Sequence, residues 1–220
     1  DLLILHDDDD TWDADFLERA ADYLSTHPER VAVVSRIEIV WEARDGDDFT
    51  EERRELFQGH LTAPSLSDTL LFNRFVPIGF LYRRSLHEEH GLYDESLPVV
   101  GDWAFNLKVL SHAELEYLPG GPAVQWRQRS GSSGADGNSV IDAEEAHRAV
   151  DARLRDAALR DYVEANGLGL VLYLTKFIDQ RFVDVESGIR SQLSEVEERL
   201  RHDLGPRGYL RAIKRRLRRR

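Results

Sequence analysis

The sequence predicts an α/β fold followed by a helical extension, and three observations carry this prediction. Short apolar runs typical of strands alternate with segments whose apolar residues recur at helical spacing. Hydrophobic residues make up 41% of the 220 residues, which is enough to bury one core. Beyond residue 142, charged residues surround sparse apolar ones. We therefore expect an α/β domain over residues 1–142 and a helical extension over residues 143–220.

Composition and charge exclude several classes of protein. The formal net charge is -12, although eight basic residues cluster between residues 207 and 220. The acidic body repels phosphate backbones, which excludes nucleic acid as its partner. The absence of cysteine excludes disulfides and thiolate metal sites, so the cytoplasm is the default compartment. No apolar run approaches the roughly 20 residues that a membrane-spanning helix needs.

The first expected element is a strand at Leu2–Leu5. Its uninterrupted apolar run is typical of a central strand buried on both faces. The run opens without an initiator methionine or a turn, so we interpret the chain as a fragment entered from upstream. His6 and the acidic run Asp7–Asp10 follow at the carboxyl end of this strand. Ligands of open α/β sheets bind beyond the carboxyl ends of strands, so a functional site is expected there.

The next elements are a helix and a hairpin. Asp13 or Asp15 can cap a helix whose apolar face contains Phe16, Leu17, Ala20, Ala21 and Leu24. Strands are expected at 31–34 and 37–41, with an acidic turn at 44–48 that closes a hairpin.

Strand and helix then alternate up to residue 129. Residues 76–82 are predicted as a strand, and Ser85 with Glu88 forms a capping box for a helix that ends at Gly91. Another helix opens at Gly101. A strand at 115–118 is expected to end in the turn at 119–122, and residues 130–139 form a loop rich in glycine and serine.

The extension is predicted to be helical over 143–165 and 185–202. Within the second segment, four apolar residues have a spacing close to that of a short coiled-coil seam. They are Ile189, Leu193, Val196 and Leu200.

The run Asp7–Asp10 is the sharpest chemical feature. Four adjacent carboxylates repel one another unless a cation lies among them. Mg²⁺ and Mn²⁺ prefer oxygen ligands and are commonly shared between carboxylates and substrate phosphates. The other interpretation is a solvated acidic loop that also caps the next helix.

The segment Leu5-His6-Asp7-Asp8-Asp9-Asp10-Thr11-Trp12 resembles the strand and Asp-x-Asp signature of family 2 glycosyltransferases. The resemblance implies the GT-A fold, a Rossmann-like three-layer sandwich that here lacks its first strands. It implies that Asp7 and Asp9 bind Mn²⁺ or Mg²⁺ together with the donor diphosphate, while Asp8 and Asp10 hold the ribose or the loop. Without the strands that cradle the base and ribose, the fragment by itself is not expected to turn over.

The segment from Leu92 to Leu107 resembles the family motif Gly-hydrophobic-Phe-Asp-Glu followed by Glu-Asp at the start of a helix. The resemblance implies that Asp102 is the general base of an inverting transfer. Gly101 replaces the glutamate found in many members. Spacing alone favours a helix N-cap as the role of Asp102, and the family resemblance favours the general base, with which a cap is compatible. Trp103 either stacks on the acceptor sugar or belongs to the core.

Two further segments resemble the family. Gly79 lies in a strand where a small residue would let a sugar approach the backbone. Arg127 and Arg129 would clamp the diphosphate, and the loop at 130–139 would close as a lid. The Gln-x-x-Arg-Trp motif of processive polysaccharide synthases is absent, which disfavours that class.

These motifs together predict a metal-dependent hexosyltransferase that moves a sugar from a UDP- or GDP-linked donor to a hydroxyl. The acceptor would be a glycan or a lipid-linked glycan of the cell surface. The basic end at 209–220 either contacts an anionic membrane peripherally or is a solvated helix end. The alternative function is a non-catalytic module that binds metal or glycan, or that assists assembly through its helices.

Overall fold

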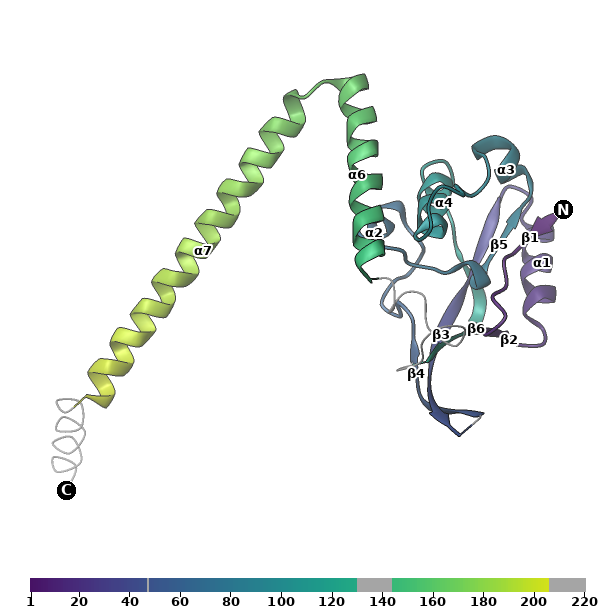
Figure 1. Ribbon diagram of the computed structural model, residues 1–220, viewed down its shortest axis with the longest axis horizontal. Coiled ribbons are helices and arrows are strands. Elements are labelled where there is room, and N and C mark those ends of the chain that lie inside the picture. Colours follow the sequence, from purple (N-terminus) through teal and green to yellow (C-terminus); the bar gives the residue numbers. More distant parts are fainter. Residues whose placement is uncertain (47, 130–143, 206–220) are drawn as a thin grey trace. The chain divides into compact units, whose positions relative to one another are not determined.

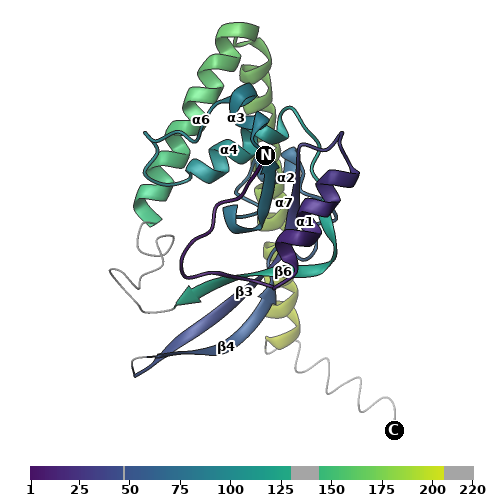
Figure 2. The ribbon, with the colours of Figure 1, turned by 90° about the vertical axis from the view of Figure 1, so that its right-hand side faces the viewer.

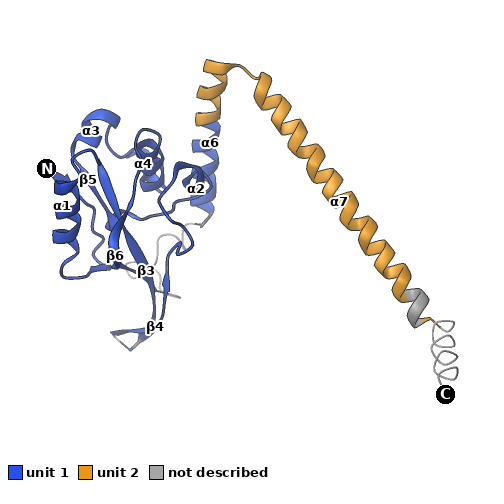
Figure 3. Ribbon diagram, turned by 180° about the vertical axis from the view of Figure 1, so that it is seen from behind, with its two compact units in different colours: residues 1–157 blue, residues 158–220 orange. Residues whose placement is uncertain are grey.

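A computed structural model describes residues 1–46, 48–129 and 144–205 (Figure 1). The chain divides into two compact units, residues 1–157 and 158–220 (Figure 3). The division falls inside α6 (Glu144–Asn166), so the first half of this helix belongs to the α/β unit. The predicted boundary at residue 142 and the predicted loop at 130–139 lie outside the described residues.

The α/β unit contains one mixed sheet, whose described strands follow the order β1-β5-β3-β6-β2, with β4 paired to β3. The strands are β1 (Leu2–Leu3), β2 (Thr11–Trp12), β3 (Ala32–Asp45), β4 (Asp48–Leu56), β5 (Phe80–Arg83) and β6 (Tyr117–Arg129). Strands β3 and β6 are parallel, and the other pairs are antiparallel. Because β1 and β3 are both antiparallel to β5, the strands β1, β3 and β6 point the same way. Their carboxyl ends therefore face one edge of the sheet.

Strand β1 differs from its prediction. It is two residues long, pairs only with β5 among the described strands, and is half-buried. Leu5 is 45% exposed. The expectation of a central strand buried on both faces is therefore wrong, because a strand with one neighbour keeps an open edge.

The central strand is β3, and it confirms the predicted hairpin. It forms one 14-residue strand and pairs with β4 across the acidic turn. Residues 32–35 are buried in succession, so both faces of the sheet are covered there. Helix α1 (Phe16–Thr26) packs on this strand through Phe16, Ala20 and Leu24, as its periodicity predicts.

Two details of α1 were predicted wrongly. Asp15 precedes the helix but makes no side-chain cap, and Asp13 instead accepts a hydrogen bond from Gln125 Nε2 at 2.9 Å. Leu17 is 43% exposed and lies outside the apolar face.

One predicted strand is shorter in the structure and another is longer. Residues Pro77–Gly79 form the 3₁₀ turn η1, so the strand predicted at 76–82 begins only at Phe80. Strand β6 continues through 119–122, where a turn was predicted. Gly120 and Gly121 have φ of +101° and +89° and absorb a register shift against β3.

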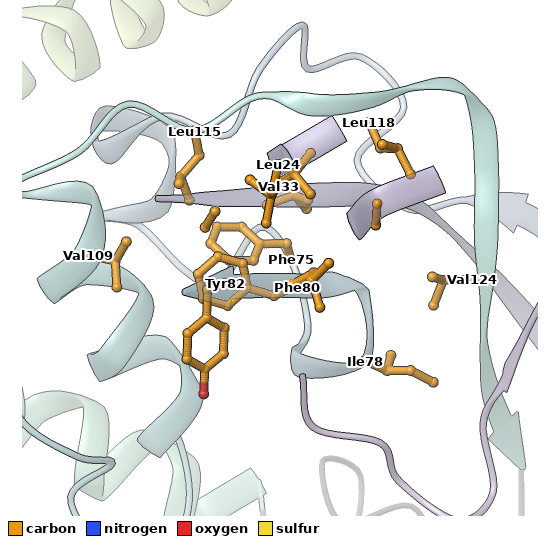
Figure 4. Packing of buried hydrophobic residues seen from close by; sticks show 14 of the residues in the cluster. Leu24, Val33, Phe75, Ile78, Phe80, Tyr82, Val109, Leu115, Leu118 and Val124 are labelled. Atoms are coloured by element: carbon orange, nitrogen blue, oxygen red, sulfur yellow. The ribbon is translucent and has the colours of Figure 1, made fainter. Parts of the chain in front are cut away.

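Three short helices complete the unit: α2 (Leu66–Thr69), α3 (Ser85–His90) and α4 (Gly101–Leu110). Ser85 lies inside α3 after Arg84, so the predicted capping box is wrong, whereas Gly91 ends the helix at φ +82° as expected. Helices and sheet enclose an aromatic core that includes Phe75, Phe80 and Tyr82 (Figure 4).

The extension is helical, as predicted, and consists of the end of α6 and the helix α7 (Gly169–Leu204). The residues of the predicted coiled-coil seam are all more than half exposed. Among the described helices, none combines the length and the apolar character needed to cross a bilayer. The basic end at 207–220 lies outside the described residues.

Candidate active site

The acidic run Asp7–Asp10 forms a turn between β1 and β2. The backbone N–H of Asp10 donates to the carbonyl of Asp7 at 3.3 Å. Beyond the turn, Trp12 Nε1 donates to the carbonyl of Ile78 at 2.9 Å, and Thr11 Oγ1 donates to Gln125 at 3.0 Å. The turn is thereby anchored to β6 and η1, near the carboxyl ends of the parallel strands (Figure 2).

The four carboxylates of the turn divide into two kinds. Asp7, Asp8 and Asp9 are exposed, whereas Asp10 is only 4% exposed. Asp10 Oδ1 accepts a hydrogen bond from the backbone N–H of Arg127 at 2.7 Å. Burial, together with the charges of Asp9 and Asp7, raises the pKa of Asp10 to about 7, although the bond from Arg127 opposes the shift. Asp10 therefore holds the turn against β6, with its carboxylate turned away from solvent.

The arginines predicted to clamp the diphosphate are bound to a buried glutamate. Glu42 of β3 is 5% exposed, and Arg127 Nη1 donates to one of its oxygens. Arg129 Nε donates to the other oxygen at 3.2 Å, and its guanidinium lies 4.3 Å from the centre of the Phe49 ring. Both guanidinium groups therefore compensate the charge of a buried carboxylate, and the diphosphate clamp stays a prediction.

Glu42 is a site residue that the sequence interpretation missed. It follows the apolar residues of β3, and its side chain is buried, which is unusual for a charged residue. That break in the alternation of a strand was the available signal. The parallel pairing of β3 with β6 decides its partners, since Glu42 pairs directly with Arg129.

The described residues contain no group of three histidine, aspartate or glutamate side chains arranged to hold a metal ion. The exposed carboxylates nevertheless fit a cation that is shared with a ligand. Partial desolvation raises the pKa of Asp7, and the negative charge of neighbouring Asp9 raises it further. A hard divalent cation needs only one or two carboxylates when phosphate oxygens complete its shell. Asp7 and Asp9 fit such a site.

Asp102 lies in a second polar cluster, at the start of α4. Its Oδ1 accepts from the backbone N–H of Trp103 at 2.7 Å, and its Oδ2 accepts from Asn73 Nδ2 at 2.8 Å. Asn106, which is 2% exposed, donates to Asn73 Oδ1 at 2.9 Å and so orients that amide. Burial raises the pKa of Asp102 against the opposing effects of Trp103 N–H, Asn73 and His147.

The residue before this helix is held in a strained conformation. Val100 has φ of +56° and ψ of +15°, the left-handed region that a β-branched residue rarely adopts. Such strain persists only where the surroundings enforce it, and it is concentrated at functional sites. Asp102 makes no N-cap, because it already lies inside the helix.

The predicted contact of Trp103 with an acceptor sugar is wrong for this structure. The side chain is 3% exposed, and its Nε1 donates to the carbonyl of Thr69 at 2.7 Å. The guanidinium of Arg155 from α6 lies 4.8 Å from the ring centre. Trp103 therefore belongs to the core, as its other interpretation expected.

Gly79 is small for a reason other than the one predicted. A Cβ at this position would lie 2.9 Å from Ile37 Cδ1 and 3.5 Å from the carbonyl of Ser35. The close approach in this structure is thus between η1 and β3 inside the core. The structure brings Asp10, Arg127 and Arg129 together at the sheet edge and holds Asp102 in the separate cluster around Asn73.

Part of the chain is similar in sequence to a known protein. The chain is 32% identical over 120 residues to the uncharacterized glycosyltransferase YwdF of Bacillus subtilis (strain 168). Over this stretch the chain is similar to a glycosyltransferase. The match covers 54% of the chain and 42% of YwdF, so the chain spans less than half of that relative. No protein-family model matches the chain.

A looser likeness exists to a solved structure. The crystal structure of S. aureus TarS 1–349 in complex with UDP-GlcNAc shares 17% sequence identity with the chain, at a TM-score of 0.41. The alignment covers 77% of this chain and 51% of that one.

Proposed function

We propose that this protein is an inverting glycosyltransferase of family 2, with a GT-A fold, that transfers a sugar from a nucleoside-diphosphate donor to a hydroxyl. The similarity to YwdF supports the reaction class. One observation carries the mechanism. Asp102 is a carboxylate whose two oxygens are held by Trp103 N–H and Asn73 and whose pKa is raised by burial.

In this mechanism Asp102 accepts the proton of the acceptor hydroxyl. The hydroxyl oxygen attacks the anomeric carbon from the face opposite the diphosphate, the new C–O bond forms, and the diphosphate leaves with the electrons of its bond. A base with a raised pKa binds the proton more strongly near neutral pH. The polar contacts of Asp102 hold its rotamer while this transfer takes place.

The metal site of the proposal consists of Asp7 and Asp9. A bound Mn²⁺ or Mg²⁺ supplies positive charge that stabilises the departing diphosphate. The two exposed carboxylates would hold the cation, and Asp8 beside them is also exposed. Asp10 and the pair of arginines on Glu42 keep the turn in place. We extend the proposal to a glycan or lipid-linked acceptor of the cell surface, modified on the cytoplasmic side of the membrane.

Calorimetric titration with UDP and GDP, with and without Mn²⁺, tests the donor site. We expect binding that requires Mn²⁺ and that is lost in Asp9→Ala. Asp22→Ala removes an equally exposed aspartate from the outer face of α1 and should bind like the wild type. In transfer assays on the chain together with the upstream strands that the fragment interpretation implies, Asp102→Asn should lower kcat by about a thousandfold and leave Mn²⁺-dependent nucleotide binding intact. Turnover by Asp102→Asn at the wild-type rate would refute the assignment of the base.

The second candidate function is a non-catalytic module that binds metal or glycan. The observation favouring it is that Arg127 and Arg129 both bind Glu42, so the expected diphosphate clamp is engaged elsewhere. This candidate predicts that Mn²⁺ binds without any contribution from UDP or GDP. It also predicts that Asp102 can be replaced without a change in ligand binding.

A further inference from the structure

Helix α7 carries an apolar repeat of eleven residues along its whole length. Successive apolar residues are separated by three, four and four positions, and the series runs through three full rounds before Leu204 begins another. We call these residues the apolar stripe: Val171, Leu174, Ile178, Phe182, Val185, Ile189, Leu193, Val196 and Leu200. An eleven-residue repeat corresponds to about 3.67 residues per turn, close to the 3.6 of an α-helix, so the stripe stays nearly straight along the helix.

The apolar stripe is open to solvent in the described part of the chain. From Leu174 to Leu200 its side chains are between 42% and 68% exposed. Helix α7 is one uninterrupted helix of 36 residues, about 54 Å long (Figures 1 and 3). A continuous apolar surface of this length on a helix marks an interaction site.

From residue 184 onward the faces beside the stripe are polar, whereas the first half of α7 also exposes Leu172, Tyr173, Phe177 and Val183. The polar side chains form ion pairs within the helix. Arg190 lies 3.7 Å from Glu186, and Arg199 lies 3.7 Å from Glu195. Lys176 pairs with Asp179 at 3.2 Å in the same way. A narrow apolar seam flanked by paired charges is typical of helices that associate with one another.

The charges argue against a lipid surface as the partner. Between residues 179 and 204 there are seven acidic and four basic residues. The acidic residues are Asp179, Asp184, Glu186, Glu195, Glu197, Glu198 and Asp203, and the basic residues are Arg181, Arg190, Arg199 and Arg201. Helices that lie on anionic membranes carry an excess of lysine and arginine on the polar face, which is the opposite balance.

We propose that copies of this chain associate through the apolar stripe of α7, two helices being the smallest closed assembly. A straight eleven-residue stripe keeps continuous contact only with a helix of the same repeat, and a second α7 supplies one. Burial of nine half-exposed side chains removes on the order of 500 Å² of apolar surface per helix. The aliphatic parts of the flanking side chains add to this buried area and bring it closer to the roughly 800 Å² per partner that stable interfaces bury. The proposal does not depend on the glycosyltransferase assignment.

Sedimentation velocity and light scattering on the 220-residue chain test the proposal. We compare the wild type with the double variant Ile189→Glu and Val196→Glu, which places two charges in the stripe about two helical turns apart, on either side of Leu193. The control is Ser187→Glu with Ser194→Glu, which adds the same charges to the polar face of the same helix segment. Circular dichroism checks that all three proteins keep their helix content.

At about 50 µM the wild type and the control should have the mass of a dimer or a higher closed oligomer. The stripe variant should be a monomer, with a dissociation constant raised at least about a hundredfold. A monomeric wild type at this concentration, or equal association of the stripe variant and the control, would overturn the proposal. So would a wild type that is monomeric in solution but sediments with vesicles containing phosphatidylglycerol, because the stripe would then serve a membrane.

Discussion

At the scale of single residues, Asp10 links the acidic turn to the stability of the fold. Its pKa is raised from 3.8 to about 7 because the carboxyl group is buried. A raised folded-state pKa means that the unfolded chain releases the proton first as pH rises. The free energy of unfolding should therefore fall between about pH 4 and pH 7 and level off above that range.

Asp10→Asn tests this, since an amide keeps an oxygen for the N–H of Arg127 and cannot ionise. Urea denaturation should show that the variant gains stability relative to the wild type between about pH 4 and pH 7. The pKa shift sets an upper bound of about 4 kcal/mol for the gain. An unchanged difference between variant and wild type across this range would contradict the buried charge.

Asn73 is a positioning residue for Asp102. Its amide stabilises the ionised form, so Asn73→Ala should raise the pKa of Asp102 further and loosen its rotamer. We expect kcat to fall about tenfold and the acidic limb of the kcat/KM profile to move to higher pH. Asn73→Ser, which keeps a donor, should restore part of both. Nucleotide affinity should not change. A variant with a higher KM but an unchanged kcat would argue for a merely structural role of Asn73.

At the scale of elements, the strain before α4 can be measured. Val100 occupies the left-handed region, which costs a β-branched residue about 1–2 kcal/mol. Asparagine tolerates this conformation, so Val100→Asn should raise the free energy of unfolding by about 1 kcal/mol. Val99→Asn, at a neighbouring half-buried position with ordinary φ, is the matched control and should not stabilise.

Strand β6 contains the glycine pair Gly120 and Gly121, and this pair gives a further testable prediction. A Cβ at Gly120 would lie 2.6 Å from Arg19 Nη2, the atom that donates to the carbonyl of Pro119. At Gly121 nothing lies within 4 Å of such a Cβ. Both residues have positive φ, so alanine at either costs about 1 kcal/mol or more. Chemical denaturation should show the greater loss for Gly120→Ala, because only there is a hydrogen bond displaced.

At the scale of the whole molecule, the first half of α6 belongs to the α/β unit. Arg155 donates to the carbonyls of Leu70 and Leu71 at 2.9 and 2.7 Å, and Val150 is 8% exposed. A chain that ends at residue 142 should therefore be less stable than one that ends at residue 157, by about 2 kcal/mol or more. Urea unfolding curves of the two chains compare them directly. Equal midpoints would place the boundary of the unit before α6.

Local patterns predicted those elements whose stability is decided locally. The periodicity of α1, the turn chemistry of the β3–β4 hairpin and the long polar helices were all readable, because each depends on residues a few positions apart. The edge position of β1 and the passage of β6 through Gly120 were not readable. Both depend on pairing with strands that are distant in the sequence.

The sequence by itself determined the strands and helices other than β2 and α2, the acidic turn at Asp7–Asp10, and the carboxylate at the start of α4. Only the tertiary structure decided that Asp10 is buried and that Glu42 binds both Arg127 and Arg129. It also decided that Trp103 is buried with the guanidinium of Arg155 over its ring. The physical reason is that burial and ion pairing are properties of surroundings. A side chain's type is written at its own position, whereas its neighbours come from β3, β6 and α6, up to 117 residues away.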